Sequence, residues 1–133
     1  MDFKDKVVVI TGASRGIGEA AAMHFASLGA HVVLAARSAG RIGEIALALR
    51  AQGSSAHAVA CDVSDPGQVM GLISEAKGTS GRLDLLVNNA GVADYKTLLK
   101  IDLTRWRQVI DINLTGAFLT LQRAARRMRA AGG

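Results

Sequence analysis

The sequence is poor in cysteine, proline and aromatic residues, and these shortages exclude some classes of protein. Its 133 residues include one cysteine, one proline and only 4% aromatic side chains. The lone Cys61 cannot form an internal disulfide, so the chain is not a disulfide-stapled scaffold. We expect Cys61 to be a small buried hydrophobic residue at a strand end and not a reactive thiol. The core must then consist mainly of Val, Ile, Leu and Ala.

Long hydrophobic runs are missing as well. The apolar run at residues 7–10 is shorter than the ~7 to 15 residues of a signal-peptide core, and nothing approaches the ~18 apolar residues of a membrane span. We therefore expect no targeting segment, no membrane partner and a cytoplasmic location. Half of the residues are hydrophobic, which argues against disorder and predicts one domain over residues 1–133.

The net charge of +5 is unevenly distributed. Residues 1–94 contain eight Lys or Arg against nine Asp or Glu, whereas residues 95–133 contain eight against two. Most of the excess lies in Arg123, Arg126, Arg127 and Arg129. A nucleic-acid patch is one interpretation. No aromatic platform accompanies these arginines, so we favour a solvated helix face near a helix C-terminus and predict no nucleic-acid partner. We also predict no metal site.

Short β-rich segments alternate with longer helical ones along the chain. Repeated four times, this pattern predicts an α/β fold with a doubly wound parallel sheet in strand order 3-2-1-4. We expect Ser64 or Asp65 to cap the third helix and Thr104 to cap the last. The expected buried stripes are Ala20, Ala21, Phe25 and Leu28 on the first helix and Ile42, Ile45, Ala46 and Leu49 on the second. The predicted strands are 6–11, 31–36, 56–61 and 83–87, and the predicted helices are 15–28, 39–52, 65–79 and 104–130.

A glycine-rich turn, residues 11–18 (TGASRGIG), joins the first strand to the first helix. Gly12, Gly16 and Gly18 permit a tight turn and a close approach by a ligand. The N–H groups and dipole at the start of the helix attract phosphate. The spacing G-x-x-x-G-x-G differs from the phosphate loop of nucleotide hydrolases and from G-x-G-x-x-G. The turn predicts a phosphate-binding site, and the alternative is close helix–strand packing alone.

The end of the second strand predicts which coenzyme is bound. Dinucleotide-binding folds carry an acidic residue there, which binds the ribose 2′-hydroxyl. This chain has Ala36 at that place, followed by Arg37 and Ser38. The Arg37 guanidinium would attract a 2′-phosphate, and Arg15 in the glycine turn adds a second positive charge. We predict NADP(H) over NAD(H), and the alternative is that both arginines face water.

Polar residues also follow the third and fourth predicted strands. Asp62, before Val63, could accept a hydrogen bond from adenine or only bond its own turn. The Asn-Asn-Ala-Gly turn at 88–91 offers two amides, one of which could serve only to tie the sheet. In the last helix, Asn113 and Gly116 are poor helix formers and predict a local kink with the amide turned inward. An exposed Asn113 on a regular helix is the alternative.

Together these motifs resemble the short-chain dehydrogenase/reductase family over the whole chain, in order and in spacing. The resemblance implies a Rossmann-type fold and hydride transfer between NAD(P) and an alcohol or ketone. It implies that Asn88 ties strands together and that Asn113 is the catalytic-tetrad asparagine, which positions a water in a proton relay. The implied cofactor-binding residues are Gly12, Ser14, Arg15, Ile17 and Gly18 for pyrophosphate and ribose, Arg37 for the 2′-phosphate, Asp62 and Val63 for adenine, and Asn89, Ala90 and Gly91 for the path from ribose to nicotinamide.

The sequence departs from the family's catalytic pattern. The other tetrad members are a Ser after the fifth strand and a Tyr-x-x-x-Lys on the next helix. Here no Ser follows Ser80, and four residues after the only tyrosine, Tyr95, stands Leu99. We interpret the chain as a truncated, amino-terminal portion that is inactive alone, with a small carbonyl or alcohol as substrate of the full-length parent. The alternative is a non-catalytic dinucleotide-binding module.

The same portion is expected to associate with itself. The strand at 83–87 should be an inner strand, yet it lacks a neighbour, and an open apolar edge invites pairing with another chain. The helix at 104–130 carries apolar residues on several sides and predicts burial all round. In the family that the chain resembles, such a helix also forms a subunit interface. We predict a homo-oligomer or self-association through this strand edge and this helix.

Overall fold

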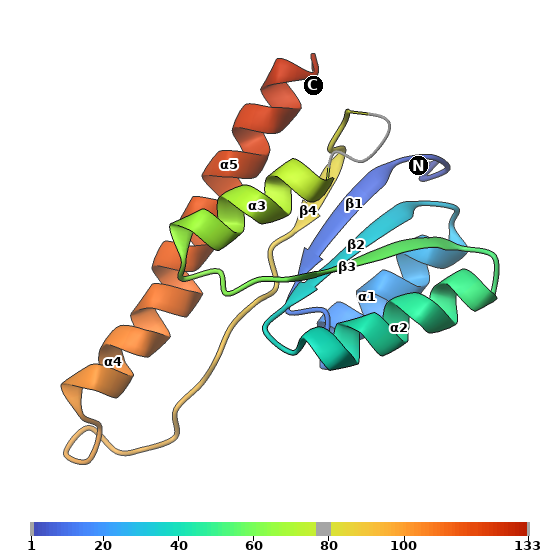
Figure 1. Ribbon diagram of the computed structural model, residues 1–133. Helices are drawn as coiled ribbons and strands as arrows, with labels where there is room; N and C mark the ends of the chain where they lie inside the picture. Colours follow the sequence, from blue (N-terminus) through green and yellow to red (C-terminus); the bar gives the residue numbers. More distant parts are fainter. Residues whose placement is uncertain (1, 77–80, 133) are drawn as a thin grey trace.

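The computed structural model describes residues 2–76 and 81–132. Strands and helices alternate up to the fourth strand, and one long helical segment follows it (Figure 1). The elements are β1 (Val7–Thr11), α1 (Gly16–Ser27), β2 (His31–Ala36), α2 (Ala39–Ala51), β3 (Ser55–Ala60), α3 (Pro66–Ala76), β4 (Leu85–Val87), α4 (Leu103–Ile110), the π-helical turn η1 (Asp111–Gly116) and α5 (Ala117–Ala130).

The four strands form one parallel sheet in the order β3-β2-β1-β4, which confirms the predicted topology. β1 lies in the middle, with Val8 opposite Val32 of β2 and opposite Leu85 of β4. Helices cover both faces, so the central strand β1 is apolar on both sides, as is usual for parallel sheets, whereas β3 alternates between more and less exposed residues. Every residue of β1 is buried.

The alternation of side chains along β1 divides the core between the two faces. Val8 and Ile10 pack with buried residues of α1 and α2. Val7 and Val9 pack on the other face with buried residues of α3 and with Ala124 of α5. The sheet is therefore held between α1 and α2 on one face and α3 and α5 on the other (Figure 1).

The predicted buried stripe was confirmed for α2 and only in part for α1, where Ala21 and Phe25 are half-buried against the core but Ala20 and Leu28 are exposed. Ile42, Ile45, Ala46 and Leu49 are all buried. On α1 the buried residues are Gly18, Ala22 and Ala26, whereas Leu28 is 41% exposed. The reason is the close approach of α1 to the glycine turn, because a Cβ at Gly18 would lie 2.1 Å from the carbonyl oxygen of Gly12. Because α1 lies so close to the glycine turn, only small residues fit on the buried side of the helix.

The start of α3 is capped by one of the two expected residues, whereas the start of α4 and the length of β4 differ from the expectations. Asp65 caps α3, since its Oδ1 accepts hydrogen bonds from the N–H groups of Gly67 and Gln68. α4 is capped by Asp102 and not by Thr104, because Asp102 Oδ1 accepts from the Arg105 N–H at 2.8 Å and its charge suits a helix N-terminus. β4 covers only Leu85–Val87. The third helix ends at Ala76, and the predicted extension over 77–79 lies outside the described residues.

The predicted kink in the last helix is a π-helical turn, η1, between α4 and α5. It brings Gly116 against the turn after β3, where a Cβ would lie 2.8 Å from Val63 Cγ2. The expectation of burial all round was wrong. Trp106, Leu114, Phe118 and Leu121 are 54–64% exposed, because the sheet contacts only one side of this helix. No helix in the described part of the chain is long and apolar enough to cross a membrane.

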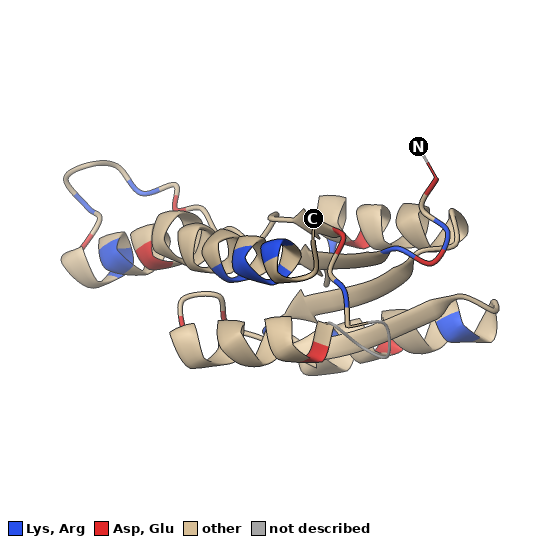
Figure 2. Ribbon diagram, turned by 90° about the horizontal axis from the view of Figure 1, so that it is seen from above, with Lys and Arg blue, Asp and Glu red and all other residues tan. Residues whose placement is uncertain are grey.

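The four clustered arginines of α5 do not share one environment. Arg126 and Arg129 are exposed, as expected for a solvated helix face, whereas Arg123 and Arg127 are half-buried. Arg127 Nη2 donates a hydrogen bond to the carbonyl oxygen of Gly81. This arginine therefore joins α5 to the segment that leads into β4. Figure 2 shows the Lys and Arg residues of the long helical segment in blue.

The contact at Gly18 predicts a large loss of stability in the variant Gly18→Ala. The new methyl group would overlap a backbone oxygen, so α1 must move, at a cost of about 3 kcal/mol in the free energy of unfolding. Gly43→Ala is the matched control. Gly43 lies in α2, where an added Cβ would have no neighbouring atom within 4 Å, so alanine should stabilise the protein by ~0.5–1 kcal/mol. Urea denaturation measures both, and equal stabilities for the two variants would contradict the packing account.

Candidate functional site

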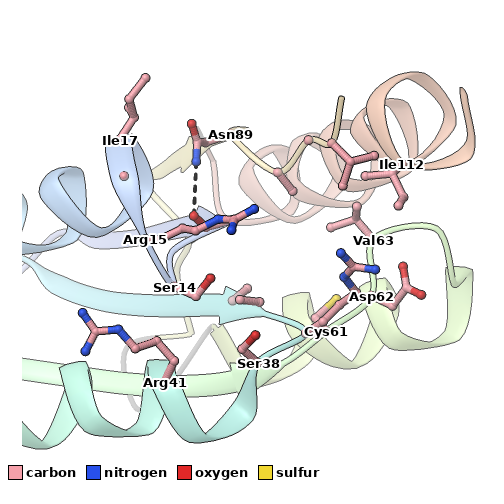
Figure 3. A pocket seen from close by; sticks show the side chains of 18 residues that line it. Ser14, Arg15, Ile17, Ser38, Arg41, Cys61, Asp62, Val63, Asn89 and Ile112 are labelled. Carbon is pink, nitrogen blue, oxygen red and sulfur yellow. Dashed lines mark hydrogen bonds between the residues drawn. The ribbon is translucent and has the colours of Figure 1, made fainter. Parts of the chain in front are cut away.

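A cavity of about 650 Å³ lies at the carboxyl ends of the strands, between the turns that follow them (Figure 3). This volume is within the usual ~300–1,000 Å³ of ligand sites. Two of the predicted site residues, Gly18 and Asn113, do not line the cavity. The structure brings the others together as lining residues: Gly12, Ser14, Arg15, Ile17, Arg37, Asp62, Val63, Asn89, Ala90 and Gly91.

The buried hydroxyl of Thr11 joins two of these turns. Thr11 is fully buried at the end of β1, and its Oγ1 accepts hydrogen bonds from the N–H groups of Asn89 at 3.0 Å and Ala90 at 2.9 Å. The Asn89 Nδ2 donates in return to the carbonyl oxygen of Thr11 at 3.2 Å and to that of Gly12 at 3.3 Å. Figure 3 shows the bond to Gly12 as a dashed line. These four bonds fix the turn after β4 against the glycine turn. Thr11 was not among the predicted site residues, and its signal in the sequence is a polar residue that ends an apolar strand.

The two asparagines after β4 have different partners. The Asn88 Nδ2 donates to the carbonyl oxygen of Ala117 at 2.9 Å, so Asn88 joins the sheet to α5. The expectation that Asn88 ties strands together is corrected by this contact. Asn89 makes that connection between β4 and β1, because its amide is the one that turns toward the end of β1.

The glycine turn forms one wall of the cavity. Gly12 and Gly16 have positive φ angles of 63° and 57°, a backbone conformation that residues with a Cβ rarely adopt. The Ala13 N–H donates to the carbonyl oxygen of Ala35 at 3.1 Å, which attaches the turn to β2. No side chain caps α1, since Arg15 makes no capping hydrogen bond. The N–H groups of the first helical turn therefore suit an anion.

The turn after β3 carries the acidic group of the cavity lining. Asp62 Oδ1 accepts hydrogen bonds from the hydroxyl of Ser64 at 2.7 Å and from its N–H at 3.0 Å. The Ser64 hydroxyl is the main cause that lowers the pKa of Asp62, and the nearby Arg37 guanidinium lowers it further. The carboxylate is thus ionised at neutral pH. The turn contact considered for Asp62 is present and uses Oδ1, while Oδ2 takes part in neither bond.

Cys61, next to Asp62, lines the cavity but is chemically quiet. The residue is 3% exposed, which confirms its expected burial. Burial, and then the charges of Asp62 and Asp65, raise the pKa of the Cys61 thiol to about 11. The thiol is therefore protonated at neutral pH, and a thiolate is needed for nucleophilic chemistry.

Positive charge collects around the end of β2 and the start of α2. Arg15, Arg37 and Arg41 line the cavity, and the position before Arg37 is the buried methyl group of Ala36. Arg41, which lies in the first turn of α2, was not among the predicted site residues. Asp62 is the acidic side chain among the described lining residues. The cavity is therefore suited to an anionic ligand.

Asn113 does not line the cavity, but it binds Val92, which does. Its Oδ1 accepts from the Val92 N–H at 2.8 Å, and its Nδ2 donates to the Val92 carbonyl oxygen at 2.6 Å. This pair of bonds connects η1 to the segment after β4. Arg105 holds the same segment, donating to Asp94 at 2.9 Å and to the carbonyl oxygen of Ala93 at 3.1 Å. The role of Asn113 in a proton relay stays a prediction.

The fold and the cavity define the class of protein. A parallel sheet in the order 3-2-1-4, covered by helices on both faces, is a Rossmann-type α/β fold. Its cavity lies outside the carboxyl ends of the strands, where the order reverses between β1 and β4, the usual ligand position in such sheets. The family model described as short chain dehydrogenase matches residues 6–133. The chain belongs to this family.

Individual relatives agree with this assignment. The chain is 44% identical over 131 residues to cis-4-hydroxycyclohexanecarboxylate dehydrogenase of Sinomonas cyclohexanicum, covering 98% of this chain and 52% of the relative. A metagenomic short-chain oxidoreductase in complex with NADP is 37% identical with a TM-score of 0.90, covering 98% and 60% of the two chains. A short-chain dehydrogenase/reductase from Burkholderia phymatum in complex with NAD is 35% identical with a TM-score of 0.95, covering 100% and 47%. The chain spans about half the length of the curated relatives it matches.

The bonds of Thr11 predict a specific loss of stability in Thr11→Val. Valine has the same shape but no acceptor, so the N–H groups of Asn89 and Ala90 lose their partner, which costs about 2 kcal/mol or more in the free energy of unfolding. Thr120→Val is the control, because Thr120 is equally buried and donates only to the carbonyl oxygen of Gly116 in its own helix. It should cost under about 1 kcal/mol. Chemical denaturation compares the two, and an equal loss would mean that burial and not the Thr11 acceptor matters.

Proposed function

We propose that this chain is the coenzyme-binding portion of an NADP(H)-dependent oxidoreductase that transfers a hydride between nicotinamide and an alcohol or ketone. Family membership and the cavity at the strand ends support the proposal. The observation that carries it is the placement of Arg15 and Arg37 in the same cavity as the glycine turn, beside Ala36. Two cations and no acidic residue at the end of β2 suit a 2′-phosphate.

The lining residues fit the parts of such a coenzyme in order. The uncapped start of α1 and the glycine turn would bind the pyrophosphate through backbone N–H groups. Asp62, with Oδ2 outside its turn contact, would accept a hydrogen bond from the adenine amine, beside Val63. Residues 89–91 would line the path from ribose to nicotinamide, where Gly91 leaves space in front of Asn113. The bound coenzyme would supply or accept the hydride.

The preference for NADP(H) rests on this chain's own arginines. One similar structure contains NADP and another contains NAD, so likeness alone does not select the coenzyme. An arginine donates charge-assisted hydrogen bonds to a phosphate, each worth roughly 1.5–3 kcal/mol when charged groups are involved. The buried Ala36 offers no acceptor for a ribose hydroxyl. We therefore expect discrimination of about tenfold or more in favour of NADPH.

These 133 residues lack the side chains that transfer the proton in this family's reaction. The Ser and the Tyr-x-x-x-Lys that complete the family's tetrad have no counterpart in this sequence. A hydride transfer to a ketone needs a positioned proton donor at the developing alkoxide. Asn113 cannot supply one, because a carboxamide N–H is far too weak an acid to donate its proton, and this amide is bonded to the backbone of Val92. We therefore propose that the chain alone binds coenzyme and does not turn over substrate.

Titration of the purified chain with NADPH and NADH tests the proposal. We expect NADPH to bind about tenfold more tightly or better, and Arg37→Gln to remove most of that difference. Arg107→Gln, an exposed arginine on α4 outside the cavity, should leave both affinities unchanged. A panel of ketones with NADPH should show no oxidation. Preference for NADH, or turnover by the chain, would contradict the respective parts of the proposal.

We also propose that two copies of this chain associate through β4 and the last helix. Among the described residues β4 pairs only with β1, and Phe118 is 57% exposed among other apolar residues of the same helix. A free strand edge beside an exposed apolar helix favours pairing with a second copy.

Sedimentation tests this association. We expect a concentration-dependent dimer or larger species, which Phe118→Glu shifts toward monomer. Leu47→Glu, at a similarly exposed position on α2 (65%), is the matched control and should leave the association unchanged. A compact monomer of the original chain at all concentrations would be evidence against the interface.

A further inference from the structure

We propose that Arg41 is a third cation of the 2′-phosphate subsite and that Glu19 sets the strength of its contribution. The inference rests on the proposed NADP(H) binding and adds a residue for specificity. Arg41 lies in the first turn of α2 and lines the cavity together with Arg15, Arg37 and Ser38. In Figure 3, Arg41 and Ser38 both rise from the start of α2, across the cavity from Ile112.

An ion pair between two helices holds the Arg41 side chain at this edge. Its Nη2 donates to Glu19 Oε1 at 2.7 Å, and its Nη1 lies 3.5 Å from Glu44 Oε2. Glu19 belongs to α1, so the pair spans from α2 to the helix that begins at the glycine turn. An arginine has five N–H donors in a planar fork. One hydrogen bond to Glu19 therefore orients the guanidinium and leaves donors for an anion.

The charges around the subsite match an additional phosphate. The described lining residues include three arginines and one aspartate, and that aspartate, Asp62, lies on the turn after β3. A phosphate monoester carries about −1.5 to −2 charges at pH 7. The start of α2 adds to the positive potential, since Ser38 makes no side-chain capping bond and the first turn holds no acidic residue. Arg41 thus adds a third positive charge to the part of the cavity in which we place the 2′-phosphate.

Glu19 acts against the phosphate while it orients Arg41. The Glu19 side chain is 25% exposed and its carboxylate lies at hydrogen-bond distance from the guanidinium, so it cancels part of the positive charge. A 2′-phosphate and Glu19 therefore compete for the same cation. Glutamine at this position would keep a hydrogen-bond acceptor and remove the competing charge. The Arg41–Glu19 ion pair would thus change the affinity for a phosphorylated ribose. An ion pair with only a structural role would change the free energy of unfolding alone, by roughly 0.2–1 kcal/mol when exposed.

Calorimetric titrations with four probes test this role: NADPH, NADH, adenosine 2′,5′-bisphosphate and 5′-AMP. We expect Arg41→Gln to weaken the two probes with a 2′-phosphate by about five- to tenfold and the other two by less than about twofold. Glu19→Gln should strengthen the same two probes by about two- to fivefold. Both effects should shrink at 0.5 M salt, since this charge interaction is screened.

Two further variants and a thermal melting curve test whether a change in affinity has another cause, such as a general change in charge or loss of the fold. Glu44→Gln is the matched control for Glu19→Gln, because Glu44 is 74% exposed and makes only the longer contact to Arg41. It should leave all four affinities nearly unchanged. Arg41→Lys keeps the charge and should restore part of the affinity lost in Arg41→Gln. Thermal melting of each variant shows that the fold is retained.

The outcomes separate this inference from the function on which it rests. If the original chain prefers NADPH and Arg37→Gln removes the preference, while Arg41→Gln changes no probe or all four alike, the role of Arg41 is refuted and the proposed function stands. If the original chain binds neither coenzyme or prefers NADH, the proposed function fails and this inference fails with it. If Arg41→Gln loses affinity only for the two probes with a 2′-phosphate, the result supports both the proposed function and the role of Arg41.

Discussion

The cavity depends on one buried acceptor, the hydroxyl oxygen of Thr11. It receives two backbone N–H groups from the turn after β4, and Asn89 returns two hydrogen bonds to the end of β1. These two strands are neighbours in the sheet although more than seventy residues separate them in the chain. In a buried place each of these polar groups needs a partner, so the two turns can take only one relative position. The glycine turn is thereby held in the place where a phosphate would meet the start of α1.

Charged side chains of both signs surround this fixed frame, and Arg37 is close enough to Asp62 to lower the pKa of its carboxyl. Arg15, Arg37 and Arg41 lie near the glycine turn and the start of α2, and Asp62 lies after β3, where Ser64 keeps it ionised. A dinucleotide with an extra phosphate has its negative charge and its adenine amine at correspondingly different places. The family membership of the chain, together with this arrangement, supports the proposed coenzyme and its orientation.

The last helix serves the cavity and the core through an irregular turn. In η1, Asn113 bonds both polar backbone atoms of Val92, and Gly116 allows the helix to approach Val63 closely. Both residues weaken a regular helix, which is why the sequence predicted an irregularity there. Beyond η1 the helix covers α3 and the sheet on one side and exposes a row of large apolar residues on the other.

The sequence by itself determined the class of fold, the strand order, the buried side of α2 and the turns that meet at the cavity. Those properties follow from local periodicity and from the rule that parallel strands end at one edge. Only the tertiary structure decided that α1 buries Gly18 and its small neighbours, that Asp102 caps α4, and that Asn89 and not Asn88 joins the strands. The same holds for the partners of Thr11 and Arg41. Each of these depends on which atom from a distant part of the chain comes within contact distance, and the local pattern of residues does not contain that information.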